Sequence, residues 1–471
     1  MSDTLLSAPR VLAEAERTFE RTIRDLCQYL EFPAVSSDPA HHDDVRRLAL
    51  QVSSDLRALG FEATVRELPD ALPLVAARIS AEDPSAPTLL IYGHIDLQPV
   101  AGEAWETPPH QAVRREAPDG ERLYARGAAD DMGGWMSHLA ALRAWLETER
   151  TVPLNVKLVL EGEEEIGSPN LERYMDAFPE DFDADVMVLT DCENPGLDLP
   201  GLTTSLRGLY EIDIECRALT SDVHSGLWGN MAPDVSTALF RAVAHLVDGF
   251  GRPKFGRTEP SEAFRESAER IPLGSDVIRQ GAHLAAGVEP LPLEGRFAAE
   301  WLWRQPALTV LSTTLPRPDA HKNALRASAR ASLSIRVPPG RDKSELRREI
   351  EELLAELPSS GVLIELSERP GGAASWLYEP KGPAFAAARR AYERVWGKPL
   401  TEIGIGGSIP FVALFGRRYA HLPLILNGVM DPLTGAHGPN ESLHLGLFKR
   451  AILTNVWLYA ELAEELRPNA E

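Results

Sequence analysis

The sequence predicts an α/β protein in which a sheet domain is interrupted by an inserted α+β module. From about residue 18 to 162, apolar runs rich in β-branched residues alternate with helical periodicity. Between about 210 and 366, polar and apolar residues alternate, as in antiparallel strands with one solvated face. A chain of 471 residues also exceeds one ordinary compact core. We therefore expect a first domain made of 1–206 and 381–471, and an inserted domain at 207–380.

The sheet domain is expected to form from helices and short buried strands in alternation. Helical periodicity over 43–59 stops at Gly60, a residue that commonly follows a helix end. In chain order, the expected elements are strands at 63–68, 74–79 and 88–92, a helix at 131–149, and strands at 155–160 and 185–191.

The inserted domain is expected to contain two helices and several antiparallel strands. In chain order these are a strand at 210–216, a helix at 232–248, strands at 307–311 and 324–337, a Lys/Glu-rich helix at 342–357 and a strand at 362–366. After residue 381 the pattern of helices and buried strands returns, with a short apolar strand at 422–427.

Composition excludes several classes of function. A net charge of −22 repels phosphate backbones and anionic lipid, so we expect neither a nucleic-acid partner nor a membrane partner. The N-terminal pattern is not that of a secretory signal, and we expect a cytoplasmic protein. Cys27, Cys192 and Cys216 lack CxxC spacing, so that any metal must be held by imidazole and carboxylate.

Two acidic motifs stand where expected elements begin or end. The tract 161–168 (EGEEEIGS) follows the 155–160 strand directly, and Asp130 and Asp131 stand where a helix begins. Each has a plain structural explanation as well, a solvated turn for the tract and a helix N-cap for the aspartates. Open α/β sheets bind ligands at the carboxyl ends of their strands, which favours a functional interpretation of the tract.

Three further positions offer metal ligands. His94 and Asp96 follow the 88–92 strand with i, i+2 spacing, so Asp96 can orient the imidazole of His94. Asp191 ends an apolar strand, and His437 lies in a glycine-flanked loop. Alone, each could equally satisfy a core or a turn. Together they supply the imidazole and carboxylate ligands of a two-metal hydrolytic site.

The order of motifs along the chain is specific. They lie at 93–99, 105–109, 126–131, 161–168, 190–191, 223–226, 334–336, 406–410 and 435–437. This order resembles the dinuclear zinc metallopeptidases related to cytosolic nonspecific dipeptidase, carnosinase, carboxypeptidase G and aminoacylase, with the dipeptidase branch the most similar. The resemblance spans about residue 25 to the C-terminus and implies a phosphorylase/hydrolase-like catalytic domain, with a mixed sheet flanked by helices and an inserted α+β lid/dimerisation domain.

The resemblance also implies roles for the acidic and histidine positions. It assigns two divalent metal ions to each subunit, with Zn²⁺ expected and Mn²⁺ or Co²⁺ possible. His94 and Asp191 would hold one ion, Glu165 and His437 the other, and Asp130 would bridge them. Glu164 matches the general base that takes a proton from the attacking water, and Asp96 matches the residue that orients His94.

Further roles fall on the inserted domain and on one loop. His224 matches a histidine that stabilises the oxyanion from the other subunit, which implies a homodimer formed through the inserted domain. Arg336 matches the residue that binds the C-terminal carboxylate of the substrate. The resemblance adds these further substrate contacts: Asn323, Gly407, Ser408 and Ile409.

Three functions are compatible with these motifs. The first is metal-dependent hydrolysis of dipeptides or short peptides with a free C-terminal carboxylate. The second keeps the hydrolytic centre but acts on N-acyl or N-carbamoyl amino acids. The third is a non-catalytic peptide-binding protein, against which the intact Glu164 argues.

Overall fold

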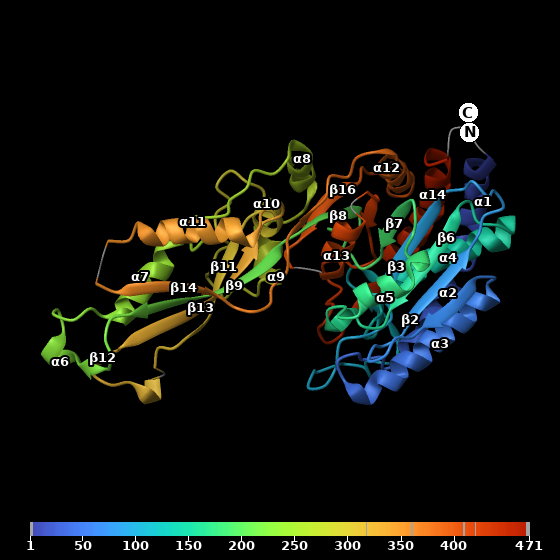
Figure 1. Cartoon of the computed structure of the whole chain (residues 1–471). Helices are drawn as coiled ribbons and strands as arrows, with labels where there is room; N and C mark the ends of the chain where they lie inside the picture. The colour runs from blue at the N-terminus through green and yellow to red at the C-terminus, as the bar shows by residue number, and fades with distance from the viewer. Residues whose placement is uncertain (1–2, 317, 359–360, 408–409, 420, 468–471) are drawn as a thin grey trace. The chain divides into compact units, whose positions relative to one another are not determined.

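The computed structural model describes residues 3–316, 318–358, 361–407, 410–419 and 421–467. The chain divides into two compact units (Figure 1). Met1–Thr204, Glu379–Ile403 and Leu414–Glu471 form the first unit, and Ser205–Tyr378 with Gly404–Ala413 form the second.

A mixed sheet of nine strands organises the first unit. Its order is β1, β2, β6, β3, β7, β17, β8 and β15, with β16 paired to β8. Figure 1 shows β2, β6, β3 and β7 side by side. The strands are β1 Glu62–Arg66, β2 Leu74–Ile79, β3 Thr88–His94, β6 Asn155–Glu161, β7 Val186–Leu189, β8 Gly201–Leu206, β15 Trp376–Leu377, β16 Thr401–Ile405 and β17 Leu424–Leu426. Strands β8 and β16 continue into the second unit, and β15 lies within the second unit.

The three strands β6, β3 and β7 are parallel and buried. Parallel strands are normally covered on both faces, which explains their nearly continuous apolar runs. The register pairs His94 with Glu161 and Tyr92 with Leu189. All three strands therefore reach their carboxyl ends at the same edge of the sheet.

Helices cover this sheet. Helix α3 packs against β1 and β2, and α4 packs against β3 and in turn against α1, α2 and α14. The helices are α1 Asp3–Arg17, α2 Phe19–Leu30, α3 His42–Ala58, α4 Met132–Glu149, α5 Leu171–Ala177, α12 Pro383–Trp396, α13 Pro410–Arg418 and α14 Leu445–Glu465. Among the described helices, none is both long and apolar enough to cross a bilayer.

A small antiparallel sheet joins distant parts of the first unit. It consists of β4 Val113–Ala117, β5 Gly120–Tyr124 and β18 Ser442–His444. The pairing of Ser442 with Tyr124 brings the segment after His437 beside the segment before Asp130.

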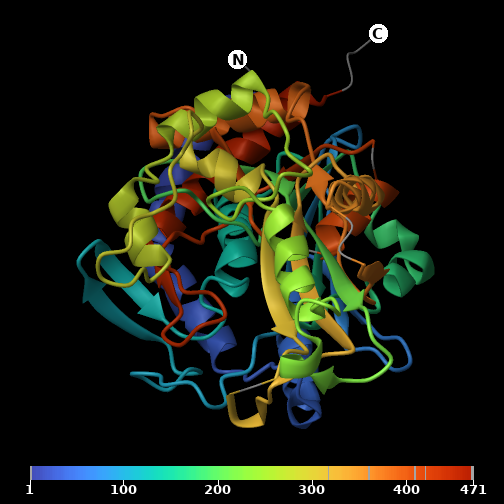
Figure 2. The ribbon, with the colours of Figure 1, turned by 90° about the vertical axis from the view of Figure 1, so that its left-hand side faces the viewer.

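The second unit is an α+β module around a four-stranded antiparallel sheet with the order β11, β13, β9, β14. In Figure 2, α7 (green) lies over these strands. Its apolar face joins residues of α11 and the sheet in one buried core. The elements are β9 Gly208–Arg217, β10 Val223–His224, α6 Ser225–Trp228, α7 Val235–His245, α8 Glu262–Arg270, α9 Ser275–Gly281, α10 Ala298–Trp303, β11 Ala307–Thr313, β12 Ala324–Leu325, β13 Ser328–Val337, α11 Lys343–Ala355 and β14 Leu363–Glu368.

The predicted α/β class, with a mixed sheet and a separate small α+β module, is confirmed, but the expected strand at 324–337 is wrong in one respect. It is divided into β12 and β13 because Ala327 leaves the ladder. The N–H of Ala327 donates to Asp222 Oδ1 at 3.0 Å, and its carbonyl accepts from the N–H of Ala218 at 3.2 Å. As a result β12 pairs with β10, whereas β13 pairs with β9 and β11.

Candidate metal centre

The carboxyl ends of β6, β3 and β7 bring four of the predicted residues together. His94 is the last residue of β3, Asp191 follows β7, and Glu164 and Glu165 begin the short 3₁₀ helix η2, Glu164–Ile166, after β6. Potential ligand atoms form two groups, and within each group the atoms lie within 4.8 Å of one another. These groups are His94, Asp130 and Glu165, and His94, Glu164 and Asp191.

Asp130 lies between two histidines. Its Oδ1 is 3.1 Å from Nε2 of His94, and its Oδ2 is 3.0 Å from Nε2 of His437. One carboxylate therefore presents a separate oxygen to each imidazole, which is the arrangement that a bridging ligand between two ions requires.

The other predicted ligands lie around this pair of histidines. Nε2 of His94 is 4.0 Å from Asp191 Oδ2, and Nε2 of His437 is 3.4 Å from Glu165 Oε2. His437 adopts a positive φ of 64°, so its loop turns sharply at the residue that faces the cluster. The amide of Gln98 donates to Glu165 Oε2 at 2.7 Å, a contact that the sequence did not predict.

Asp96 contacts both the imidazole and the acidic loop. Nδ1 of His94 is 3.0 Å from the carbonyl of Asp96 and 3.4 Å from its Oδ1. The same carboxylate accepts the backbone N–H groups of Glu164 at 3.1 Å and Glu165 at 3.0 Å. Asp96 thus contacts the ring of His94, and its side chain also holds the turn that carries the two glutamates.

Asp131 does not act as the helix cap that the sequence left open. It stands at the N-cap of α4 without a side-chain capping hydrogen bond. Its Oδ2 instead accepts from Thr190 Oγ1 at 2.6 Å and from the N–H of His94 at 3.2 Å. Asp131 therefore holds the backbone of β3 at His94 by a hydrogen bond. No pattern in the sequence predicted this role.

The cluster concentrates negative charge in a buried place. Burial, followed by the charge of Asp130, raises the pKa of Glu165 and of Asp191 to about 8 in each case. The hydrogen bond to Asp130 raises the pKa of His437 to about 9. Among the described residues, the ion-pair partners of Asp130, Asp191 and Glu165 are the histidines His94 and His437, and none is a Lys or Arg. Oxygen and imidazole donors in this number fit two divalent cations.

His224, the predicted oxyanion donor, and Asn323, a predicted substrate contact, are close to each other in the second unit. The register of β10 and β12 pairs His224 with Ala324, and the carbonyl of Asn323 accepts from the N–H of Ser225 at 3.2 Å. Nδ1 of His224 accepts from the N–H of Gly226 at 3.0 Å. With Nδ1 accepting in this way, the exposed His224 can donate a hydrogen bond only through Nε2.

Arg336 lies near a second arginine that the sequence did not single out. Arg207 donates through Nε to the carbonyl of Gly406 at 3.0 Å and through a terminal nitrogen to the carbonyl of Gln305 at 3.3 Å. Burial and then the positive charge of Arg336 lower the pKa of Arg207 to about 10. Within the described part of the chain, neither guanidinium pairs with a carboxylate. Two uncompensated cations favour an anionic ligand.

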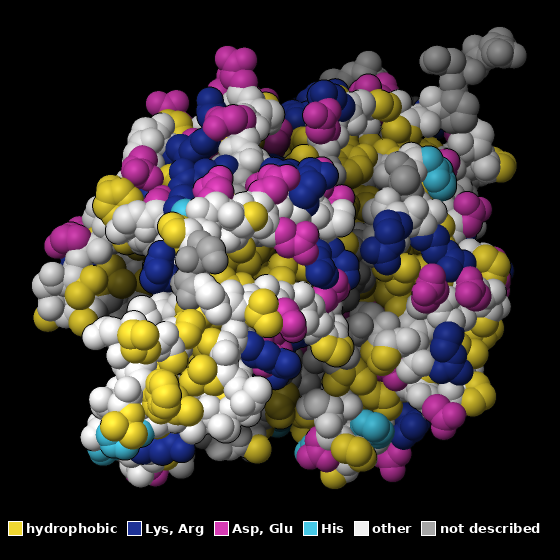
Figure 3. Space-filling view, turned by 60° about the vertical axis from the view of Figure 1, so that its left-hand side comes forward, with side chains coloured by type: hydrophobic (Ala, Val, Ile, Leu, Met, Phe, Trp, Pro, Cys, Tyr) yellow, Lys and Arg dark blue, Asp and Glu magenta, His cyan; other side chains and the backbone are white. Residues whose placement is uncertain are grey.

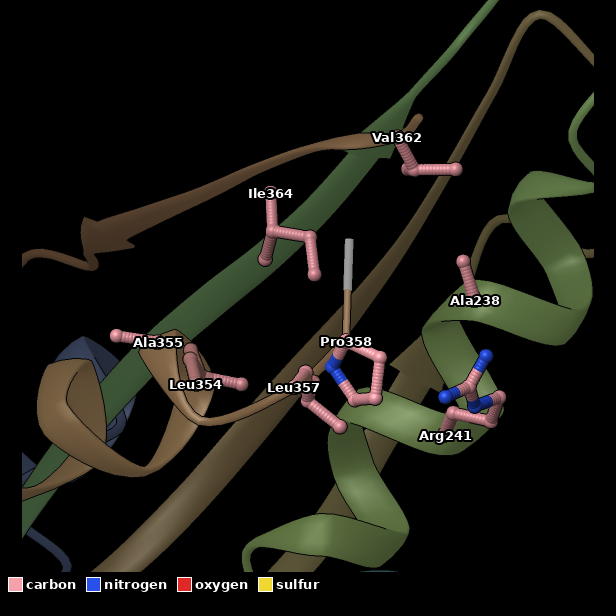
Figure 4. Close-up of a pocket in the computed structure, with 8 residues that line it drawn as sticks. All are labelled: Ala238, Arg241, Leu354, Ala355, Leu357, Pro358, Val362 and Ile364. Carbon is pink, nitrogen blue, oxygen red and sulfur yellow. The ribbon is translucent and has the colours of Figure 1, made fainter. Parts of the chain in front are cut away.

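The remaining predicted contacts lie in the loop after β16. A Cβ added to Gly407 would meet nothing within 4 Å, so this position faces open space. Ser408 and Ile409 lie outside the described residues. A pocket of about 270 Å³ between α7 and α11, lined by apolar groups and Arg241, includes none of the predicted site residues (Figure 4).

The sheet and its donor set define a metal-dependent hydrolase, since imidazoles and carboxylates meet where parallel strands end. The chain belongs to peptidase family M20/M25/M40, whose family model matches residues 90–465. It is therefore a metallopeptidase, and the resemblance inferred from the motifs is confirmed.

Individual relatives agree with this assignment. A cysteinylglycine-S-conjugate dipeptidase of Corynebacterium striatum is 32% identical over 429 residues, which cover 90% of this chain and 91% of that protein. The crystal structure of human carnosine dipeptidase 1 superimposes with a TM-score of 0.71 at 22% identity, covering 97% of this chain and 99% of the other. A metallo-carboxypeptidase of Sulfolobus solfataricus gives a TM-score of 0.72 at 24% identity, covering 94% and 99%. The two structures support the fold.

Proposed function

We propose that this chain hydrolyses dipeptides or short peptides with a free C-terminal carboxylate, using two divalent metal ions, with Zn²⁺ expected. The observation that carries the proposal is the position of Asp130, with one oxygen toward His94 and the other toward His437. The dipeptidase name of the 32% identical relative supports the substrate class.

The proposed roles are those that the motif resemblance implies for these residues. His94 and Asp191 would hold one ion, Glu165 and His437 the other, and Asp130 both. Ions bound there polarise a carbonyl and lower the pKa of water.

Glu164 is the proposed general base. Asp96 holds the backbone of Glu164, while the Glu164 side chain joins the ligand group around His94. A carboxylate in this position can take a proton from the attacking water and return it to the leaving amine.

The proposed oxyanion donor is Nε2–H of His224, supplied by the second subunit of a homodimer. Because His224 is exposed and its Nδ1 already accepts from Gly226, its Nε2 is the nitrogen that can donate to a substrate bound in another subunit. The second unit also exposes large apolar side chains near His224, namely Leu227 (74% exposed), Trp228 (53%) and Met231 (83%). Figure 3 shows hydrophobic groups on the face turned to the viewer. We propose that this unit is the lid and dimerisation domain.

Arg336 is the proposed partner of the substrate's C-terminal carboxylate. A carboxylate bound there would offset part of the positive charge of the neighbouring Arg336 and Arg207 guanidinium groups. The parallel N–H groups of a guanidinium also match the two oxygens of a carboxylate. Asn323 and the loop 407–409 are proposed to contact the rest of the substrate. We expect a cytoplasmic enzyme.

The test is a substrate panel on protein reconstituted with Zn²⁺, Mn²⁺ or Co²⁺ after chelation. We expect chelation to abolish hydrolysis of dipeptides and metal to restore it. Full activity in metal-free protein would overturn the mechanism. Activity on N-acyl or N-carbamoyl amino acids with none on free-amine dipeptides would favour the alternative substrate class.

A further inference from the structure

We propose that Glu441 is a positioning residue of the metal centre. Its carboxylate holds the turn that presents Asp130 and joins this turn to the segment that carries His437. The proposal rests on the proposed function only in assigning Asp130 and His437 to the metals.

Glu441 binds the turn before Asp130 with both carboxylate oxygens. Oε1 accepts from the N–H groups of Ala129 at 3.1 Å and Asp130 at 3.2 Å. Oε2 accepts from the N–H of Gly127 at 3.1 Å and from Arg126 at 3.0 Å. The side chain is fully buried, so these four donors replace water completely.

The contact is charge-assisted and depends on a carboxylate. Arg126 supplies the counter-charge and is itself held by Glu103 at 3.1 Å. An amide at position 441 keeps the shape but has one acceptor oxygen, so its NH₂ group would face N–H donors. Such a mismatch in a buried place leaves donors unpaired and lets the turn move.

Glu441 also closes the loop that bears His437. Its carbonyl accepts from the N–H of Ala125 at 3.2 Å. At the other end of the loop, Asp431 pairs with Arg122 at 2.7 Å and accepts from the N–H of Leu433 at 2.9 Å. Both ends of the His437 loop are therefore anchored, and Glu441 holds this loop through its backbone carbonyl and the Asp130 turn through its side chain. Displacing it would move a ligand of each proposed ion.

The experiment compares Glu441→Gln with Glu461→Gln. Glu461 on α14 is also buried and pairs with Arg390 at 2.6 Å and Arg394 at 2.9 Å, but it contacts none of the cluster. Both variants lose a buried charge that faces arginine, so a general loss of stability affects both. Metal affinity is measured by competition of the full-length holoenzyme against a chelator, and the geometry of the centre by the absorption spectrum after Co²⁺ substitution.

We expect Glu441→Gln to weaken metal binding about 10- to 100-fold and to alter the Co²⁺ spectrum, as residues that orient ligands do. Glu461→Gln should change neither. If Glu441→Gln does not fold, Glu441→Asp is expected to show the same defect. The shorter side chain keeps the negative charge but moves the carboxylate away from the N–H groups of the Asp130 turn. Unchanged affinity and spectrum in a folded Glu441 variant would overturn the proposal. Retention of both ions by Asp130→Ala would instead overturn the assignment of the metal centre.

Discussion

His94 and His224 both lie at strand ends, and their surroundings differ in almost every other respect. His94 is fully buried, with its backbone N–H held by Asp131 and its ring placed between Asp96 and Asp130. His224 is exposed, and its Nδ1 accepts from Gly226 two residues along the chain. The first histidine takes its position from tertiary contacts, whereas the second takes its position from its own turn.

This difference indicates two kinds of functional group. A metal ligand has to keep its position beside the other ligands, and hydrogen bonds from surrounding groups fix that position. A histidine that serves another subunit needs an outward-facing N–H and a locally fixed ring. Each of the following experiments tests one side of this contrast.

The largest effect is expected from Asp130→Ala. Removal of the group between the two histidines should abolish metal binding and activity together, because both proposed ions lose a ligand. Metal content by elemental analysis and turnover of a dipeptide measure this. Retained ions would show that the buried cluster is a structural network.

Glu164→Gln should impair the chemical step without impairing metal binding. We expect turnover to fall by about 10²- to 10⁴-fold with metal content unchanged, since the amide cannot accept the proton. Glu172→Gln on the surface of α5 is the control and should leave turnover intact. Loss of metal in Glu164→Gln would reassign this residue as a ligand.

His224→Ala should reduce turnover by about 10²- to 10³-fold, the loss expected for one oxyanion donor. His245→Ala on α7 is the matched histidine control and should be near wild type. The role in trans is tested by mixing inactive His224→Ala and Glu164→Ala proteins.

Half of the reassorted dimers would be mixed, each with one complete site of two, so roughly a quarter of wild-type activity should return. If subunits exchange and no activity returns, His224 serves its own subunit. The exposed position of His224 would then need another explanation.

The smallest effect is expected from Arg336→Ala. Loss of a charged hydrogen-bonding group should reduce kcat/KM about 10- to 100-fold on peptides with a free carboxylate, and little on peptide amides. The control is Arg330→Ala. Arg330 lies on the same strand and pairs with Glu215 at 3.3 Å, so its loss should change kcat/KM for neither substrate. Equal losses on both substrates would reject Arg336 as the carboxylate partner.

The sequence by itself determined the α/β class, the α+β module and the strands whose ends carry His94, Glu164 and Asp191. These features are local, since a buried strand needs a continuous apolar run and its ligand follows directly in the chain. The domain boundaries and the roles of the site residues came from the ordered motifs, and they remain predictions for the experiments above.

Only the tertiary structure decided which residues from distant segments form hydrogen bonds with one another or place their charges close together. The contact of Glu441 with the Asp130 turn and the nearness of Arg207 to Arg336 join segments far apart in the chain. The break between β12 and β13 likewise depends on Asp222, which lies in the connection between β9 and β10. Loops carry no periodicity, and their hydrogen-bond partners are chosen by the packing of the whole domain, so no local pattern could have specified these contacts.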